Sequence, residues 1–157
     1  MKIRKLSYRD FDGLFELISE IYDENPSATW FAQKPSIEEV EALLGYKLAK
    51  IKDKDAVDYV ALEKDIVLGE CEIIKDESNN GWLGIIVKKD FRRKGLGSKL
   101  LKKCIQAARR LGIESIFAEV AATNSAIEFF KKKGFEIKSL EDKEGRSIVL
   151  LQLVKKG

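Results

Sequence analysis

The chain has 157 residues, of which 45% are hydrophobic and 35% are charged, a composition typical of globular rather than disordered proteins. It contains two cysteines and no histidine, which argues against metal binding through the usual ligands and excludes Ser-His and Cys-His nucleophiles. The length favours a single domain over residues 1–157, and a net charge of +3 does not by itself imply an affinity for nucleic acid.

The first half of the chain predicts strands and two helices. Residues 1–6 alternate charged and apolar side chains and indicate a first strand. Asp10 can cap a helix with apolar positions from 11 to 22, and a capping box at Ser36 opens a second helix that extends through Leu48. Two runs, 58–62 and 66–74, then predict a hairpin, and a turn separates it from a short strand ending at residue 87.

The second half begins with a basic loop and a clear amphipathic helix. The apolar face of this helix extends from Leu96 to Leu111, and Gly112 ends it. We expect a strand at 113–120, a helix at 124–133, and two strands at 135–137 and 147–154. Since no repeat or linker interrupts this order, the sequence predicts a mixed α/β sheet in one domain.

The loop at residues 88–98 has the features of an anion-binding site. It leads from a strand directly into a helix, where unpaired amides and the helix macrodipole attract negative charge. Gly95 and Gly97 let the backbone approach a pyrophosphate closely. Arg92, Arg93 and Lys94, directly before the first glycine, add positive charge. It is neither a P-loop nor a dinucleotide fingerprint, and a basic helix start without a ligand is the alternative interpretation.

Two motifs resemble the GNAT superfamily of N-acetyltransferases. Arg92-x-x-Gly95-x-Gly97 is similar to the family signature Q/R-x-x-G-x-G/A. Residues 124–135, NSAIEFFKKKGF, resemble the family segment N-x-x-A-x-x-(F/L)-Y-x-K-x-G-F, with one residue fewer between the asparagine and the alanine. Both stand in the family's order and separation. The resemblance implies the GNAT fold, a central mixed, mostly antiparallel sheet of about six or seven strands with about four flanking helices, and an activity that uses acetyl-CoA.

Carried over by position, the resemblance also implies a binding site for acetyl-CoA. Backbone groups of Ile85, Ile86 and Val87 would pair with the pantetheine arm like an added strand. Asn124 and the helix after it, which contains Phe130, would flank the pantetheine and the thiol. Main-chain amides of the glycine loop would hold the pyrophosphate, and these belong to Arg93, Lys94, Gly95, Leu96, Gly97 and Ser98.

The expected reaction is direct attack of an amine on the thioester, for which a base must remove the amine's proton. The family commonly places a glutamate near the start of the strand before the glycine loop, where this chain has Trp82 and Leu83. The adjoining strand offers Glu70 and Glu72, which lie two residues apart and therefore on the same face. Glu72 is the first candidate and Glu70 is the second. Glu119 is a weaker candidate. The alternative interpretation is that Glu70 and Glu72 belong to an ordinary solvent-facing strand surface.

A second departure from the family is Phe130, which stands where a tyrosine commonly protonates the leaving thiolate. A thiol is acidic, with a pKa of about 8.5 for cysteine, so CoA can leave without that proton donor. Tyr59 and Tyr22 are possible replacements. These departures also motivate an alternative function that is not enzymatic, a non-catalytic sensor that binds acyl-CoA.

The first candidate for the acceptor is a protein lysine, because residues 116–120 followed by Asn124-x-Ala126 resemble Pat-type protein lysine acetyltransferases. The second candidate is a small cationic amine such as a polyamine, an aminoglycoside or an amino acid. Acidic residues on the second predicted helix could attract a cation, although such residues more commonly form a solvated helix face. These are Glu38, Glu39 and Glu41.

No apolar run approaches the roughly 20 residues that cross a bilayer, and the N-terminus lacks a signal-peptide core. We therefore expect a cytoplasmic protein with no membrane partner, either a monomer or a homodimer. Direct binding of nucleic acid is not expected, because it would need aromatic residues among the basic clusters and Phe91 alone does not supply them.

Overall fold

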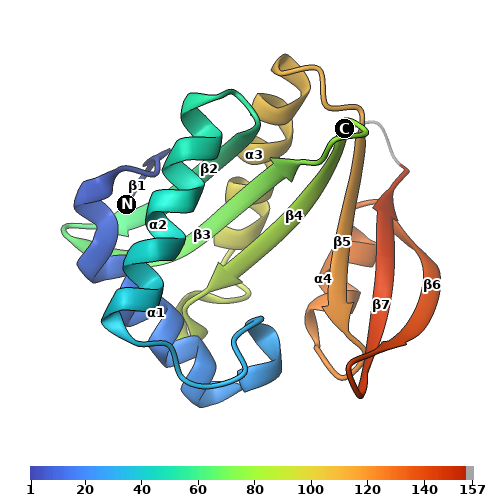
Figure 1. Ribbon diagram of the computed structural model, residues 1–157, viewed down its shortest axis with the longest axis horizontal. Helices are drawn as coiled ribbons and strands as arrows, with labels where there is room; N and C mark the ends of the chain where they lie inside the picture. The colour runs from blue at the N-terminus through green and yellow to red at the C-terminus, as the bar shows by residue number, and fades with distance from the viewer. Residues whose placement is uncertain (155–157) are drawn as a thin grey trace.

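The computed structural model describes residues 1–154, and its centre is a seven-stranded sheet in the order β1-β2-β3-β4-β5-β7-β6 (Figure 1). All neighbouring strands are antiparallel except β4 and β5, which are parallel. This confirms the predicted mixed, mostly antiparallel sheet. The strands are β1 (Lys2–Lys5), β2 (Ala56–Glu63), β3 (Ile66–Lys75), β4 (Asn80–Val87), β5 (Ser115–Ala121), β6 (Phe135–Lys143) and β7 (Arg146–Leu153).

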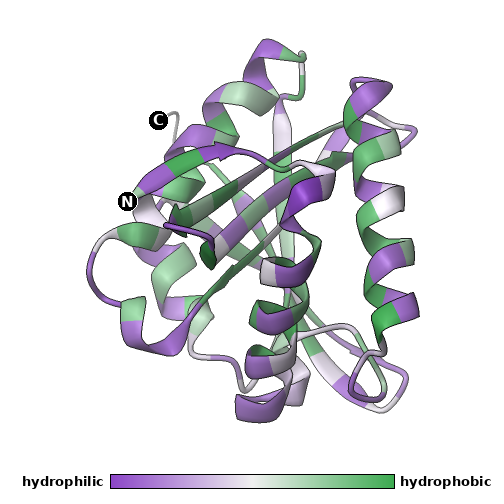
Figure 2. Ribbon diagram, turned by 90° about the vertical axis from the view of Figure 1, so that its left-hand side faces the viewer, coloured by the Kyte–Doolittle hydropathy of each residue, from purple (hydrophilic) through white to green (hydrophobic). Residues whose placement is uncertain are grey.

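Helices cover both faces of the sheet. One apolar core lies between the sheet and α1 (Phe11–Glu24) with α2 (Ile37–Lys52), and the other lies beneath α3 (Leu96–Arg110) and α4 (Ala126–Lys132). Figure 2 shows helices striped in hydrophobic and hydrophilic colours, as expected when one side packs on a sheet. None of these helices has the length and apolar character needed to cross a membrane. Three short 3-10 turns are η1 (Tyr8–Asp10), η2 (Pro26–Ala28) and η3 (Lys89–Phe91).

The predicted capping box at the start of α2 is confirmed. The Ser36 hydroxyl accepts a hydrogen bond from the Glu39 amide, and the Glu39 carboxylate accepts one from the Ser36 amide, both at 3.1 Å. The prediction for β6 was too short, since the strand runs to Lys143 instead of ending at residue 137. It continues because Glu144 and Gly145 both have positive φ, which suits a tight hairpin into β7.

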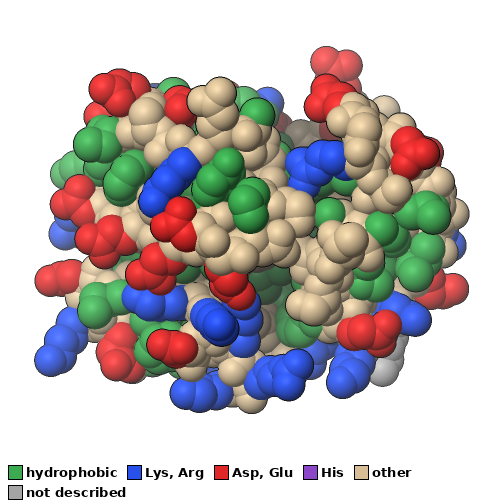
Figure 3. Space-filling view, turned by 90° about the horizontal axis from the view of Figure 1, so that it is seen from below, with side chains coloured by type: hydrophobic (Ala, Val, Ile, Leu, Met, Phe, Trp, Pro, Cys, Tyr) green, Lys and Arg blue, Asp and Glu red, His purple; other side chains and the backbone are tan. Residues whose placement is uncertain are grey.

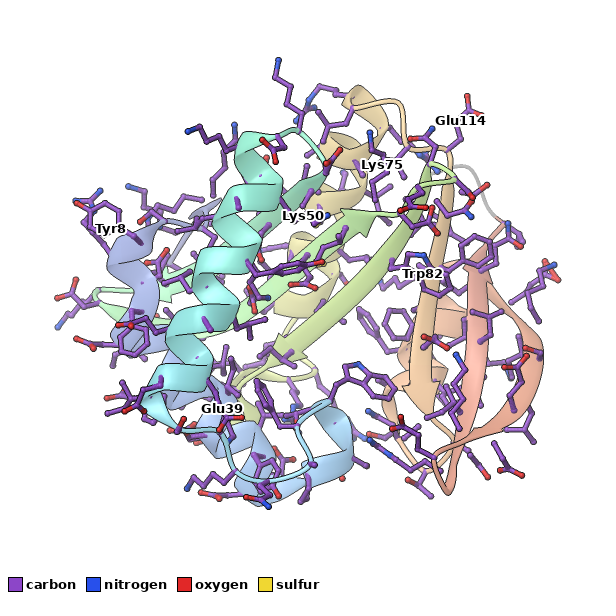
Figure 4. The ribbon with its side chains drawn as sticks, viewed as in Figure 1. Tyr8, Glu39, Lys50, Lys75, Trp82 and Glu114 are labelled. Carbon is purple, nitrogen blue, oxygen red and sulfur yellow. The ribbon has the colours of Figure 1, made fainter. Side chains whose placement is uncertain are left out.

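The sheet opens between its two parallel strands. Only three residue pairs join β4 to β5, from Asn80–Ser115 to Trp82–Phe117. Trp82 stacks on Phe117 at the closed end, with ring centroids 5.3 Å apart, and Figure 4 shows Trp82 between the two strands. Beyond this point β4 stays paired with β3, while β5 stays paired with β7. The two strands therefore diverge and leave facing edges without a partner strand (Figure 1).

Candidate active site

A cavity of about 400 Å³ lies where β4 and β5 separate. The segment around η2 and the helices α1 and α2 contribute one wall, and the diverging strands with the start of α4 contribute the others. The cavity brings together most of the residues predicted from the sequence outside the glycine loop. Its lining includes Glu70, Glu72, Ile85, Ile86, Glu119, Asn124 and Phe130, together with Trp30, Phe31 and Lys47.

Backbone groups of β4 point into the gap in an alternating pattern. The Lys88 amide donates to the Leu68 carbonyl at 2.8 Å, which fixes the even-numbered residues of this strand as the ones bonded to β3. The amides and carbonyls of Ile85 and Val87 therefore face the gap, and those of Ile86 face β3. The Val87 carbonyl accepts a hydrogen bond from Arg92 Nε at 2.8 Å, which agrees with this alternation.

The glycine loop forms a concave row of backbone amides at the start of α3. Arg93 and Gly95 both have positive φ, a conformation that arranges successive amides around an anion. No side chain caps α3, so the first amides of the helix are available to a ligand. Arg93 and Lys94 are exposed. Seen from below, the surface at this end of the sheet carries Lys and Arg side chains along one margin (Figure 3).

The side chain of Arg92 is 39% exposed, but hydrogen bonds to the protein hold it in place. Its guanidinium contacts both carboxylate oxygens of Glu24, at 2.5 and 2.7 Å, in addition to the Val87 carbonyl. The hydrogen bond from Arg92 lowers the pKa of Glu24. Arg92 thus ties the glycine loop to the end of α1, while Arg93 and Lys94 beside it remain exposed to solvent.

Glu70 and Glu72 differ in their access to the cavity because of the residue opposite each one in β4. Ile86 lies opposite Glu70 and covers it, and the Glu70 side chain is 5% exposed. Gly84 lies opposite Glu72 and has no side chain, so Glu72 is 22% exposed. Burial raises the pKa of Glu72; the charge of Lys47 opposes this shift and the charge of Glu70 adds to it.

The sequence patterns did not point to two further members of this charged group, Lys47 and Asp58. The Lys47 ammonium contacts the carboxylates of Glu70, at 2.9 Å, and Glu72, and it lies 3.6 Å from that of Asp58. Lys47 lies three residues after Leu44 and seven after Val40, on the same buried face of α2. A charged residue in an apolar helical stripe was the signal that could have revealed it.

A model of the acetyltransferase (GNAT) family matches residues 11–135. The chain belongs to the GNAT family. The two motifs that suggested this membership, the glycine loop and the segment at 124–135, both lie within the matched residues. The GNAT fold expected from them is confirmed.

Solved structures and a curated relative agree with this assignment. A ribosomal-protein-alanine N-acetyltransferase from Brucella melitensis has a TM-score of 0.81, 22% identity, and coverage of 97% of this chain and 98% of its own. An acetyltransferase from Salmonella typhimurium, solved with its cofactor acetyl-CoA, has a TM-score of 0.80, 22% identity, and coverage of 100% and 96%. An amino-acid acetyltransferase from Azotobacter vinelandii is 24% identical over 89% of this chain and 28% of its own length. The chain spans about a quarter of the length of the curated relatives that it matches.

Within this GNAT chain, the two departures noted in the sequence have structural explanations. Trp82 donates from its indole to Asp76 at 2.9 Å and stacks on Phe117, so it secures the closed end of the gap. Phe130 packs against Phe135 and also lines the cavity. Neither Tyr22 nor Tyr59 is among the cavity-lining residues of the part that the structure describes.

Proposed function

We propose that this protein transfers the acetyl group of acetyl-CoA to a primary amine. The observation that carries the proposal is the position of Glu72, which opens into the same cavity as the unpaired edge of β4. An extended ligand can pair with this edge as an additional strand would. The end of such a ligand then lies in the same cavity as the Glu72 carboxylate. In the reaction, the amine nitrogen forms a bond to the acetyl carbon, and the thiol of CoA leaves.

The residues present suit the parts of CoA. The concave amides at the start of α3, with Arg93 and Lys94 beside them, fit a pyrophosphate by charge and by hydrogen-bond donors. Ile85 and Val87 offer backbone groups to the amides of the pantetheine arm. Asn124 accepts from the Ala126 amide at 2.8 Å and lines the cavity at the start of α4, beside the expected thiol end.

We assign Glu72 as the base that removes the proton of the acceptor amine. An aliphatic ammonium has a pKa of about 10.4, so nearly all of the acceptor is protonated at neutral pH. It must lose this proton before its nitrogen can attack. A carboxylate with a raised pKa accepts that proton more readily than an ordinary one. Glu70 is covered by Ile86 and is the less suitable of the two candidates. Glu119 lines the cavity too, but it is engaged by Lys143 at 2.5 Å.

For the acceptor we propose a protein lysine. Trp30 is 61% exposed and lines the cavity with Phe31, so an apolar surface is available for the methylene stem of a lysine. The carboxylates farther inside suit its ammonium group. A small cationic amine also carries an ammonium group and is the second candidate. Comparing lysine peptides with small amines as acceptors distinguishes the two.

The test measures release of free CoA from acetyl-CoA in the presence of lysine peptides, polyamines, aminoglycosides or amino acids. We expect release with an amine acceptor and a loss of at least about a hundredfold in kcat for Glu72→Gln, the usual effect of removing an acid or base. Glu63→Gln, at the exposed end of β2, is the matched control and should keep full activity. Binding of acetyl-CoA without release would support the sensor alternative, and absence of binding would contradict both.

A further inference from the structure

Four charged residues meet behind the candidate base, and we call them the Lys47 cluster: Lys47, Asp58, Glu70 and Glu72. Carboxylate oxygens of the three acids all lie within 4.8 Å of one another. The Lys47 ammonium lies among them and contacts Glu70 and Glu72 directly. Of the four side chains, only that of Glu72 is more than 8% exposed.

Strand register explains why these acids converge. Asp58 in β2 pairs with Glu72 in β3, and Val60 pairs with Glu70, so Asp58, Glu70 and Glu72 share one face of the sheet. That face is covered by α2, whose inward stripe of Val40 and Leu44 continues with Lys47. The helix thus delivers one cation to a site where the sheet supplies three acids.

The cluster cannot hold three ionised acids around one ammonium, because the uncompensated charge would be buried at a penalty of several kcal/mol per ion. Asp58 is the acid that the geometry leaves without a donor. Neither of its carboxylate oxygens has a hydrogen-bond partner among the described residues, and the group is 3% exposed. A protonated Asp58 resolves this, because its hydroxyl can donate to the neighbouring Glu70.

The remaining charges then balance around Glu72. Although burial alone would lower the pKa of Lys47, the charges of its acidic neighbours, Glu70 first and Glu72 next, hold it well above its usual value. Asp10 of η1, a buried acid whose charge also acts on Glu70, is engaged by Arg4 at 2.7 Å. Lys47 is then positive, Glu70 is negative and Asp58 is neutral. An ionised Glu72 at the cavity wall leaves the cluster with a single net negative charge.

We propose that Lys47 is a positioning residue that holds Glu72 as a carboxylate turned toward the cavity, while Asp58 stays protonated and donates a hydrogen bond to the Glu70 carboxylate. The proposal rests on the proposed function, because it explains how the candidate base is prepared. Lys47 does not need to contact the acceptor amine. It acts through its contact with Glu72 and through the charge that it balances on Glu70.

This arrangement predicts opposite effects for two substitutions. Glu70→Gln removes a negative neighbour, so the titration midpoint of Glu72 should move to lower pH. Lys47→Met removes the positive neighbour, and the midpoint should rise by about one to three pH units, the range for an opposite charge at this separation. Because Lys47→Met leaves Glu70 unbalanced and can prevent folding, the double variant Lys47→Met/Glu70→Gln is the main comparison.

In the double variant, the midpoint should still lie above that of the parent, because Lys47 touches Glu72 directly whereas Glu70 acts across the cluster. Lys47→Arg keeps the charge and should stay nearest to the parent. A residue that only fills space would lower stability in all variants without displacing the midpoint in opposite directions.

The experiment is a carbon-13 NMR titration of the side-chain carboxyl groups, with the Glu72 signal identified by its loss in Glu72→Gln. Displacement downward in Glu70→Gln and upward in the double variant supports the proposal. A midpoint that does not move, or a Glu72 that is protonated at neutral pH in the parent, overturns it. The titration needs no acetyl-CoA, so a chain that titrates as expected but acetylates no amine would contradict only the proposed function. Where activity is measurable, the acid limb of the kcat/KM profile should follow the same order.

Discussion

Glu70 and Glu72 have the same side chain and lie two residues apart on one strand face, yet their surroundings differ. Ile86 shields the first, whereas Gly84 leaves the second open to the cavity. A methyl group built at Gly84 would reach within 3.8 Å of the Glu72 carboxylate, which shows how closely β4 passes it. Access to the candidate base is therefore controlled by a residue without a side chain.

At Asp58, the proposed protonation makes stability depend on pH. Burial, followed by the charge of Glu70, raises the pKa of Asp58 well above its usual value, so the folded protein binds this proton more tightly than the unfolded chain does. Its contribution to stability is complete below the unfolded pKa of about 3.9 and is lost as the pH rises through the folded pKa. Asn at this position keeps a donor for Glu70 and does not titrate.

We therefore expect Asp58→Asn to match the parent near pH 4 and to become the more stable protein as the pH rises. The gain should be at most about 1.4 kcal/mol per pH unit up to the folded pKa. Urea unfolding at pH 4.5 and 7.5 measures it. Asp58→Leu, which offers no donor, should be less stable than the parent at both values. An Asp58→Asn variant that is less stable than the parent at pH 7.5 would show that Asp58 is ionised.

Sequence patterns identified the candidate acids but not their common setting. Glu70 and Glu72 were found because residues two apart share a strand face, and Phe130 because a motif has tyrosine there. Lys47 lies 23 residues from Glu70, and their proximity depends on how α2 docks onto the sheet. That docking is a property of tertiary packing, which no local pattern reports.

Among the elements, α1 and α2 contain glycines with opposite surroundings. Gly45 of α2 is exposed, and a methyl group added there would meet nothing within 4 Å. Gly13 of α1 faces Val67, and a methyl group there would overlap the valine side chain. The missing side chain at Gly13 thus allows α1 to approach β3 closely.

We expect Gly45→Ala to stabilise the protein by about 0.5–1 kcal/mol, since alanine loses less backbone entropy than glycine in a helix. Gly13→Ala has the same intrinsic preference but should destabilise, because α1 would have to move away from β3. Thermal and urea unfolding of the two variants give a matched comparison. A stabilised Gly13→Ala would contradict the close packing of α1 described here.

Periodicity and capping signals in the sequence predict the boundaries of helices and strands more readily than they predict which strands pair. The capping box at Ser36 and the amphipathic stripe of α3 are local signals, and the structure confirms both elements. The parallel contact of β4 with β5 joins segments separated by α3, and it ends after Trp82. Strand order and the point of divergence are set by which strands the whole chain brings together, so the cavity could not be placed in advance.

At the scale of the whole molecule, the diverging strands divide the sheet into two parts joined by three residue pairs. A ligand that pairs with the open edge would bridge these parts. Such a ligand stabilises the folded state by mass action, by about 2.7 kcal/mol at a free concentration one hundred times its Kd. The stabilisation should be strongest locally at the backbone groups that gain hydrogen bonds.

Hydrogen exchange with and without acetyl-CoA tests this bridging residue by residue. The amides of Ile85 and Val87 face the gap and should gain protection on binding. The Ile86 amide already bonds to β3 and is the internal control, with little change expected beyond that of the whole molecule. Equal protection at all three positions would contradict the proposed pairing of the ligand with β4.

The Lys47 cluster also limits how this sequence can change over generations. Loss of Lys47 alone would leave Glu70 buried without its cation, and loss of Glu70 alone would leave Lys47 with less compensation. A lineage can therefore replace these two residues most easily together, for example by two apolar side chains of similar volume. Such a paired replacement would keep the fold and give the descendant a different pH range in which Glu72 is ionised.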